Sequence, residues 1–287
     1  MLNTIKENIE RRLGLSSGKN IVREPQIIEN IGNWTGRYSH WRTNDDLRNY
    51  KFVENSHAPF TPARRALPML NLALISSAGA HIDGTDAFDI TARDGDASFR
   101  EIPIEVEAED LRYAARGYDP AAVQQDRNVQ IPVERLLEYQ ANGVIGNLNN
   151  VWWSFNGFIP NAGLVAESLA PKIVERLQRY EVQAALLVPA SRLCHQTIAL
   201  IARALEEAGI PTIMIGVERD VVEMVRPPRT AYYVGELGSV VGKPNWKEYQ
   251  LRVLDEALRW IETFDQPGVR KLAVELETET EKSRGEK

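Results

Sequence analysis

The chain has 287 residues and a formal net charge of −6, with 43% hydrophobic and 26% charged residues. This is an ordinary globular composition, and the length allows one large domain or two small ones. The acidic balance without a basic stripe argues against nucleic acid as a partner, and no apolar run approaches the roughly 20 residues that would cross a membrane.

The first 66 residues predict a helix followed by an extended arm. Residues 1–15 have the spacing of an amphipathic helix and lack the apolar core of a signal peptide. Aromatic residues then stand among polar ones, and the Pro-Phe-Thr-Pro run at residues 59–62 is rigid and extended. We expect this irregular arm to wrap the main body or a partner subunit.

Residues 67–265 alternate apolar runs with amphipathic stretches, which predicts one α/β domain. Strands that alternate with helices favour a mostly parallel sheet with flanking helices and Rossmann-like units. We expect strands at residues 70–75, 104–107, 143–146, 184–188, 213–217 and 230–234, and helices at residues 132–142, 166–180, 195–208, 221–225 and 246–264. The charged residues 266–287 are predicted to form a disordered tail.

The centre of this prediction is the strand, turn, helix and strand at residues 184–217. Cys194 lies where the first strand gives way to the helix, and His195 follows it. Free backbone N–H groups at the start of a helix stabilise an anion, so a thiol there ionises readily and can act as a nucleophile. The alternative is a small core residue, because free cysteines often serve only in packing.

The predicted ligand site lies at the carboxyl ends of the strands, where open α/β sheets bind their ligands. We expect the loops after residues 75, 146 and 188 to form it. The polar-aromatic stretch at residues 147–157, which includes Trp152 and Trp153, either lines this pocket or covers the sheet edge as a surface loop. Small residues after the first strand let the backbone approach a ligand, which makes Ser77 and Gly79 candidate binding residues. His81 stands in the same loop, where a loop role is more common than that of a base.

Several motifs, spread in order over residues 58–264, resemble one known family. They are Gly-Asp-Ala-Ser-Phe-Arg at 95–100, Asp-Arg-Asn at 126–128, Pro-Val-Glu-Arg-Leu at 132–136, Ser-Arg-Leu-Cys-His-Gln at 191–196 and Leu-Gly-Ser-Val-Val-Gly-Lys-Pro at 237–244. The chain resembles the selenoprotein B-type subunits of the glycine, sarcosine, betaine and D-proline reductases, most closely the D-proline reductase branch. In that family a selenocysteine stands three residues before a cysteine. Here that position is Ser191.

The resemblance implies reductive cleavage of a C–N bond. In the selenocysteine-containing relatives the selenolate attacks the carbon that bears the amine, and the cysteine then resolves the selenium. A partner subunit's pyruvoyl group activates the amine. Ser191 cannot replace the selenocysteine, because an unactivated hydroxyl is a poor nucleophile and has no redox couple.

Three interpretations stay open. In the first, Cys194 is the nucleophile, aided by the helix N-terminus and by His195, and an external thiol completes the reduction. In the second, the pocket carries a non-redox step of lyase or isomerase type, with Cys194, His195 or Asp119 moving a proton. In the third, the chain is a non-catalytic subunit that shapes a partner's site.

The resemblance also implies contacts with substrate. Arg100 ends the first motif, and its planar guanidinium suits a substrate carboxylate. Asp119 is the acidic residue retained from another stretch of the family, while Gln196 and Thr197 follow the cysteine directly. Ser191 is expected to bind substrate through its hydroxyl or to cap the helix.

A single cysteine allows no internal disulfide, which fits a reducing cytoplasm, and no Cys/His cluster has zinc spacing, so we expect no metal. We therefore expect a cytoplasmic enzyme of amino-acid-type amine metabolism without a cofactor of its own. An external thiol reductant or a partner's pyruvoyl group would support it. It should take a small amine or amino-acid-like substrate, and form a homo-oligomer or pair with a reductase subunit.

Overall fold

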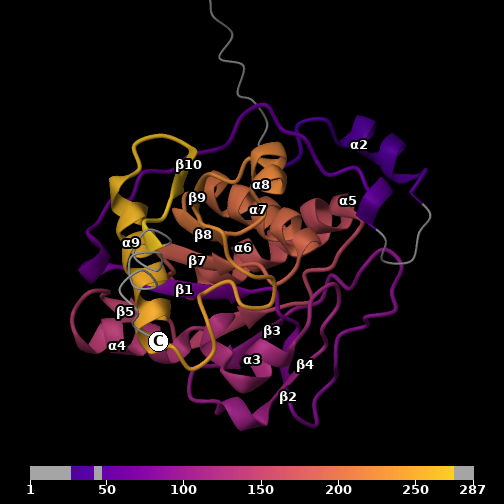
Figure 1. The fold of residues 1–287 in the computed structure, drawn as a ribbon. Coiled ribbons are helices and arrows are strands. Elements are labelled where there is room, and N and C mark those ends of the chain that lie inside the picture. Colours follow the sequence, from indigo (N-terminus) through magenta and orange to yellow (C-terminus); the bar gives the residue numbers. More distant parts are fainter. Residues whose placement is uncertain (1–26, 42–46, 275–287) are drawn as a thin grey trace, which may run out of the picture.

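The computed structural model describes residues 27–41 and 47–274 (Figure 1). The strands are β1 (Asn71–Ser76), β2 (Ala80–Ile82), β3 (Arg100–Pro103), β4 (Leu111–Tyr113), β5 (Asn147–Leu148), β6 (Val151–Ser154), β7 (Ala184–Val188), β8 (Thr212–Gly216), β9 (Arg229–Tyr232) and β10 (Gly268–Lys271). The α-helices are α2 (Ile31–Tyr38), α3 (Ala121–Gln125), α4 (Val133–Ala141), α5 (Ala162–Leu164), α6 (Ala170–Arg179), α7 (Arg192–Glu207), α8 (Arg219–Val225) and α9 (Lys247–Thr263).

The main sheet is mostly parallel. Its strands follow the order β10-β9-β8-β7-β1-β6-β3, and β5 also pairs with β1. Only β3, at one edge, runs antiparallel to its neighbour β6, and β2 pairs with β4 in a separate antiparallel ribbon. Helices flank the sheet on both sides (Figure 1). The predicted α/β class with a mostly parallel sheet is therefore confirmed.

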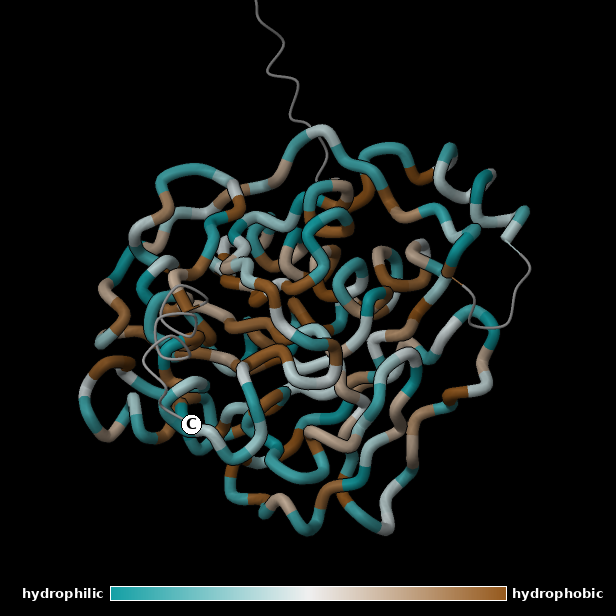
Figure 2. Tube along the Cα trace, in the orientation of Figure 1, coloured by the Kyte–Doolittle hydropathy of each residue, from teal (hydrophilic) through white to brown (hydrophobic). Residues whose placement is uncertain are grey.

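The central strands are apolar because both faces of the sheet are covered. In β7, Ala185 and Leu187 pack into the core shared with α6, α7 and α8, whereas Leu186 and Val188 pack into the core shared with α4 and α9. A strand buried on both faces carries apolar residues on both, which gives a continuous run rather than alternation. Figure 2 shows these hydrophobic strands enclosed by more hydrophilic outer segments.

The described part of the arm packs against the chain's own body, along α7. The Gln196 side chain donates a hydrogen bond to the Tyr50 hydroxyl and accepts one from the Val53 amide, both at 2.7 Å. Arg203, 2% exposed, donates to the carbonyl oxygen of His57 at 2.6 Å. The arm thus closes over the helix that carries Cys194. The predicted helix at residues 1–15 lies outside the described residues.

A buried ion pair joins this arm to the sheet. The side chains of Glu206 on α7 and Arg229 on β9 are 0% exposed and form a salt bridge. The Glu206 carboxylate also accepts hydrogen bonds from the amides of Thr61 at 2.5 Å and Thr212 at 2.7 Å. The Arg229 guanidinium lies 4.1 Å from the centre of the Phe60 ring. The neighbouring strands β8 and β9, the helix α7 and the arm therefore share one charged cluster.

Two strand boundaries differ from the prediction. The edge strand is β3 rather than residues 104–107, because the chain turns where the Val106 amide donates to the Pro103 carbonyl at 3.2 Å. No strand starts within residues 143–146: Gly143 has a φ of +69° and ends the turn after α4, and β5 and β6 follow. Trp152 and Trp153 therefore lie in a buried strand instead of a pocket-lining loop.

The C-terminal boundary also differs. β10 falls within the segment predicted as a tail, yet it pairs in parallel with β9 over four residues. Leu272 and Val274 beyond it are buried in the α4 and α9 core. Apolar residues spaced by two within a charged stretch mark this edge strand. Residues 275–287, the rest of the predicted tail, lie outside the described residues.

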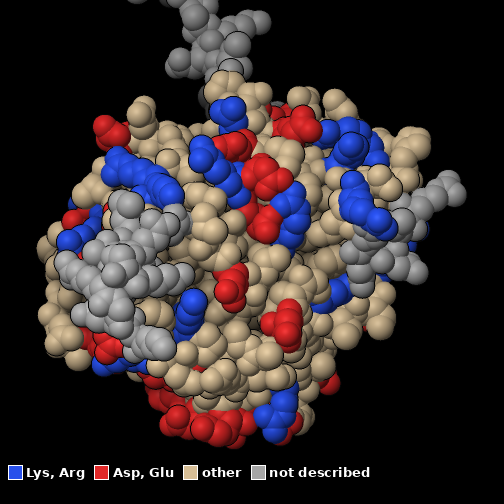
Figure 3. All heavy atoms as spheres, viewed as in Figure 1, with Lys and Arg blue, Asp and Glu red and all other residues tan. Residues whose placement is uncertain are grey.

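Surface charge is mixed in the part of the chain that the structure describes. Figure 3 shows basic and acidic side chains interspersed on the visible face, with acidic ones gathered near the β2–β4 ribbon. None of the helices in the described ranges combines the length and the apolar character that a membrane-spanning segment requires.

Candidate functional site

The candidate site lies where β1 and β7 end side by side at the centre of the sheet. After β1 the chain runs to β4 and α4, which pack on the α9 side, whereas after β7 it enters α7 on the opposite side. Such a divergence between neighbouring parallel strands leaves a crevice at which open α/β sheets bind ligands. The loops that meet here follow residues 76, 154 and 188, so the predicted loop after residue 146 is replaced by the one after β6.

Cys194 and Ser191 form the centre of the site. Ser191 is the N-cap of α7, and its hydroxyl oxygen accepts a hydrogen bond from the Cys194 amide at 3.2 Å. The same hydroxyl donates to the Cys194 sulfur at 3.0 Å. Each residue is 1% exposed. The Ser191 hydroxyl therefore bridges the backbone amide and the sulfur of Cys194 within the first turn of α7.

Ser77 ties the two strand ends together. Its amide donates to the Val188 carbonyl at 3.1 Å, and its hydroxyl oxygen accepts from the Ala190 amide at 3.0 Å. Gly157, in the loop after β6, lies over Ser77 and Cys194. A Cβ at Gly157 would stand 2.5 Å from the Ser77 Cβ and 2.8 Å from the Cys194 sulfur, so only glycine fits there.

The motif at residues 237–244 supports the same turn from the other side. The Gly238 amide donates to the Ala190 carbonyl at 2.8 Å, one residue before Ser191. The Val241 amide donates to the Val129 carbonyl, also at 2.8 Å, which joins this motif to the one at residues 126–128. The motif at residues 237–244 therefore contacts the Cys194 turn directly, and the motif at residues 126–128 lies beside it.

Tyr118 is a residue of this site that sequence reasoning missed. Its ring packs against Ala78, Ala190 and Cys194, and its hydroxyl donates to the Ala78 carbonyl at 2.7 Å. Burial, with a smaller contribution from the neighbouring Cys194 thiol, raises the pKa of Tyr118 well above its ordinary value. The available signal was its position directly before Asp119, the acidic residue singled out in the sequence.

Asp119 itself is exposed, and its carboxylate accepts a hydrogen bond from the Ala121 amide at 3.0 Å at the start of α3. Gln196 and Thr197 are fully buried and engaged within the chain. Gln196 binds the arm, and Thr197 donates to the Gly157 carbonyl at 2.8 Å, which holds the loop over the thiol. In this structure Gln196 and Thr197 hold the segments that surround the thiol, and Asp119 binds the start of α3. The predicted roles of the three residues toward substrate stay predictions.

His195 is fully buried, and both ring nitrogens are engaged by backbone groups. Nδ1 lies 2.7 Å from the Ser191 carbonyl, and Nε2 accepts from the Val217 amide at 3.1 Å. Because Nε2 must accept, the ring is neutral with its proton on Nδ1. Burial lowers the pKa of His195 to about 4. The residue therefore ties the Cys194 turn to the residue that follows β8.

The burial of His195 should make stability depend on pH. Since the fold holds the neutral ring, stability is complete above about pH 6.5 and falls as the pH drops toward 4. The total loss should be about 3 kcal/mol, because each pKa unit is worth about 1.36 kcal/mol. Urea unfolding of the wild type and of His195→Asn between pH 4 and 7 measures it, and the variant should lack this component.

Thr197→Val is the matched control, because it loses a buried hydrogen bond on the same helix turn without removing a titrating group. Its stability deficit should be the same at every pH. A His195→Asn variant that keeps the full wild-type slope would contradict the assignment of a neutral, buried ring.

The remaining predicted residues lie in the loop after β1 and on the edge strand. Gly79 has a φ of +69°, and a Cβ there would stand 2.6 Å from the Ala114 carbonyl oxygen, so glycine is required for a close backbone approach. His81 lies on β2 and is 8% exposed. Its Nδ1 is 3.4 Å from the Gly79 carbonyl oxygen, a contact at the limit of hydrogen bonding.

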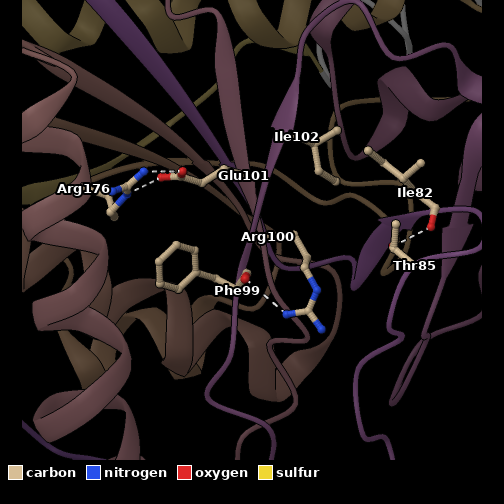
Figure 4. A pocket seen from close by; sticks show the side chains of 7 residues that line it. All are labelled: Ile82, Thr85, Phe99, Arg100, Glu101, Ile102 and Arg176. Carbon is tan, nitrogen blue, oxygen red and sulfur yellow. Dashed lines mark hydrogen bonds and ion pairs between the residues drawn. The ribbon is translucent and has the colours of Figure 1, made fainter.

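Arg100 lines a different cavity, of about 510 Å³, along β3. Its guanidinium lies 4.4 Å from the centre of the Phe88 ring and donates to the Asp86 and Phe99 carbonyls at 3.1 Å each. Figure 4 shows that Arg100 and the ion pair of Glu101 with Arg176 point to opposite sides of the strand. None of the residues given for this cavity belongs to the Cys194 turn, so the structure does not bring Arg100 to the thiol.

Within residues 27–41 and 47–274, no group of three or more His, Cys, Asp or Glu side chains is arranged to hold a metal ion. What the site offers chemically is a single buried thiol, a hydroxyl aimed at it, and backbone amides at a helix start. The histidine beside the thiol has both ring nitrogens engaged by backbone groups, which leaves it no free nitrogen for acid–base chemistry.

Comparison with known proteins identifies the family of the chain. Residues 49–190 match the family described as glycine/sarcosine/betaine reductase selenoprotein B. The D-proline reductase subunit gamma of Acetoanaerobium sticklandii is 30% identical over 200 residues, which cover 70% of this chain and 81% of that protein. The glycine reductase complex component B subunit gamma of Symbiobacterium thermophilum is 28% identical, over 58% of this chain and 39% of its own length.

A third relative, the sarcosine reductase complex component B subunit beta of Peptoclostridium acidaminophilum, is 27% identical over 54% of this chain and 36% of its own length. No solved structure shows significant similarity to the chain. The relatives are subunits of amino-acid reductase complexes, and the one covered over most of its length carries the D-proline reductase name. The chain therefore belongs to the glycine, sarcosine, betaine and D-proline reductase selenoprotein B family.

Proposed function

We propose that this chain is a selenium-free B-type subunit that cleaves the C–N bond of an amino-acid-like amine, with Cys194 as the nucleophile. The observation that supports it most is the Ser191 hydroxyl, which donates to the Cys194 sulfur at 3.0 Å at the N-terminus of α7. A hydrogen-bond donor and a helix N-terminus both stabilise a thiolate. In this proposal the serine supports the sulfur nucleophile that takes over from selenium.

The reaction would proceed in three balanced steps. The Cys194 thiolate attacks the carbon that bears the amine, a C–S bond forms, and the nitrogen leaves with the bonding electron pair as ammonia or an amine. An external thiolate then attacks the Cys194 sulfur, and the released carbanion, stabilised by the neighbouring carboxyl group, takes up a proton. A second external thiol reduces the resulting mixed disulfide. Two thiols are oxidised to a disulfide for each C–N bond reduced.

The partner's pyruvoyl group, in this proposal, would condense with the amine and make the nitrogen a better leaving group. No described residue of this chain is assigned to that group. What this chain contributes is the thiolate, the serine that polarises it, and a site from which water is excluded by the surrounding loops.

Alkylation of Cys194 by iodoacetamide as a function of pH tests the proposal. Cys194 is the chain's single thiol, so the signal has one source. Removal of the Ser191 hydroxyl in Ser191→Ala or Ser191→Gly should move the midpoint of the pH–rate profile upward by about 1–2 units, because a hydrogen bond to a charged group is worth about 1.5–3 kcal/mol. Glycine is included because it remains a good N-cap, which limits damage to α7.

Ser154→Ala is the matched control. Ser154 ends β6, is fully buried, and its hydroxyl has no hydrogen-bond partner among the described residues. This variant should keep the wild-type midpoint. A midpoint that is the same in the wild type and in both Ser191 variants would reject the poised thiolate.

The second candidate function is a non-catalytic subunit of a reductase-like complex. The burial of Cys194, at 1% exposure, favours it. In that case alkylation should occur only from the unfolded state, and the rate should follow global stability across all variants. The non-redox lyase or isomerase has less support, because His195 is neutral and engaged and Asp119 is exposed.

A further inference from the structure

Cys194 is surrounded on most sides by the rigid body of the protein. Ala78, Ala190 and Asn156 are 1%, 0% and 4% exposed, and each follows a strand of the central sheet. Tyr118 belongs to a different kind of segment. It lies between β4 and α3, is itself only partly buried, and is flanked by the exposed residues Gly117 and Asp119.

We infer that Tyr118 is the gate of the Cys194 site, so that substrate and the reducing thiol reach the sulfur only when its ring moves away. This inference rests on the proposed function in taking Cys194 as the reacting group. Two partly buried side chains pack on the cluster of Ala78, Ala190 and Cys194. Tyr113 is held in β4, whereas the Tyr118 ring comes from the loop between β4 and α3. A small amine and a thiol reductant must both reach the same sulfur in turn, which a permanently closed site would not allow.

Two glycines allow the Tyr118 segment to pack closely in its closed position. Gly117 has a φ of +79°, and a Cβ there would lie 2.5 Å from the Phe158 ring and 3.3 Å from the Ser191 Cβ. Gly238 lies against the Tyr118 ring, where a Cβ would stand 2.9 Å from Cδ2. The segment therefore fits closely against the Cys194 turn, while Gly117 gives the backbone beside the ring conformational freedom.

One hydrogen bond, made by the hydroxyl group of Tyr118, holds the ring in the closed position. The Tyr118 hydroxyl donates to the Ala78 carbonyl at 2.7 Å, directly after β1. A single neutral hydrogen bond contributes little net stability, so an open minority state is accessible. The gate would thus open without unfolding the sheet or α7.

The test is the rate of Cys194 alkylation by iodoacetamide under native conditions. Tyr118→Phe keeps the ring and removes the hydrogen bond, and it should react about fivefold faster than the wild type, the factor that corresponds to about 1 kcal/mol. Tyr118→Ala removes the ring and should react at least about twentyfold faster. The Tyr118→Phe result decides the question if the alanine variant does not fold.

Tyr139→Phe is the matched control, because the Tyr139 hydroxyl also donates to a backbone carbonyl, that of Leu251 at 3.0 Å, between α4 and α9. It should react at the wild-type rate. The gate is overturned if both Tyr118 variants react at the wild-type rate, or if Tyr139→Phe accelerates the reaction as much as Tyr118→Phe, since exposure would then come from global unfolding.

The alkylation experiment tests the gate and the proposed function separately, because the two proposals predict changes in different quantities. Opening multiplies the alkylation rate by the same factor at every pH and leaves the midpoint of the profile in place. Loss of the Ser191 hydroxyl moves the midpoint. A Tyr118 effect on rate with no Ser191 effect on midpoint would keep the gate and reject the poised thiolate, and the reverse result would reject the gate alone.

Discussion

Replacing Cys194 with alanine should abolish thiol-dependent cleavage of the amine, with a fall in rate of at least about a thousandfold. Removal of an attacking nucleophile leaves only the catalysis that binding and orientation provide. The protein is assayed with any subunits that co-purify from its native host, with dithiothreitol as the reductant and glycine, sarcosine, betaine and D-proline as amines. The readout is released ammonia or amine, or the ring-opened product of D-proline, together with oxidised dithiothreitol.

The stoichiometry adds a second criterion, because one disulfide should appear for each C–N bond cleaved. Ser154→Ala is the control variant, as its buried hydroxyl makes no hydrogen bond among the described residues. Amine cleavage that persists in Cys194→Ala would exclude the cysteine as nucleophile and leave the subunit a supporting role. Cleavage without oxidised thiol would instead favour the non-redox alternative.

Replacing Arg229 with methionine should lower the free energy of unfolding by about 3–5 kcal/mol. The variant leaves the Glu206 carboxylate buried without its counter-charge, and breaking a buried pair by removing one partner costs this much. Burial raises the pKa of Glu206 to about 7 and lowers that of Arg229. Urea unfolding at pH 5 and pH 8 measures the loss, which should be larger at pH 8, where protonation can no longer neutralise the orphaned carboxyl.

The matched control is Arg219→Met, which removes an arginine from a salt bridge with Glu223 whose side chains are 64% and 56% exposed. An exposed pair contributes at most about 1 kcal/mol, so this variant should unfold almost as the wild type does. Equal losses in the two variants would mean that the buried cluster does not hold the arm and the sheet together. Because the Glu206 amide partners include Thr61, protease sensitivity near residue 61 should rise in Arg229→Met alone.

Much of the fold follows from local pattern. The apolar run at residues 184–188 forms β7 as predicted, and the helix that follows ends near Gly209, where glycine with a φ of +86° terminates it. The edge strands of the sheet were harder to predict. β3 and β10 are short, and each is defined by its hydrogen bonds to one neighbouring strand, β6 or β9. Trp152 and Trp153 looked like pocket residues because the sequence does not show that both faces of β6 are covered.

The α/β class, the parallel sheet and the position of Cys194 in the first turn of α7 could be predicted from the sequence alone, since they depend on periodicity and on strand–helix order. Which groups meet the thiol depends on how distant segments pack. Gly157, Tyr118 and Gly238 come from three loops far apart in the chain, and only the packing of those loops brings them to the Cys194 turn. The same packing makes His195 a neutral residue that connects two backbone groups. This could not be read from the sequence, because the role of a histidine depends on what its two ring nitrogens contact.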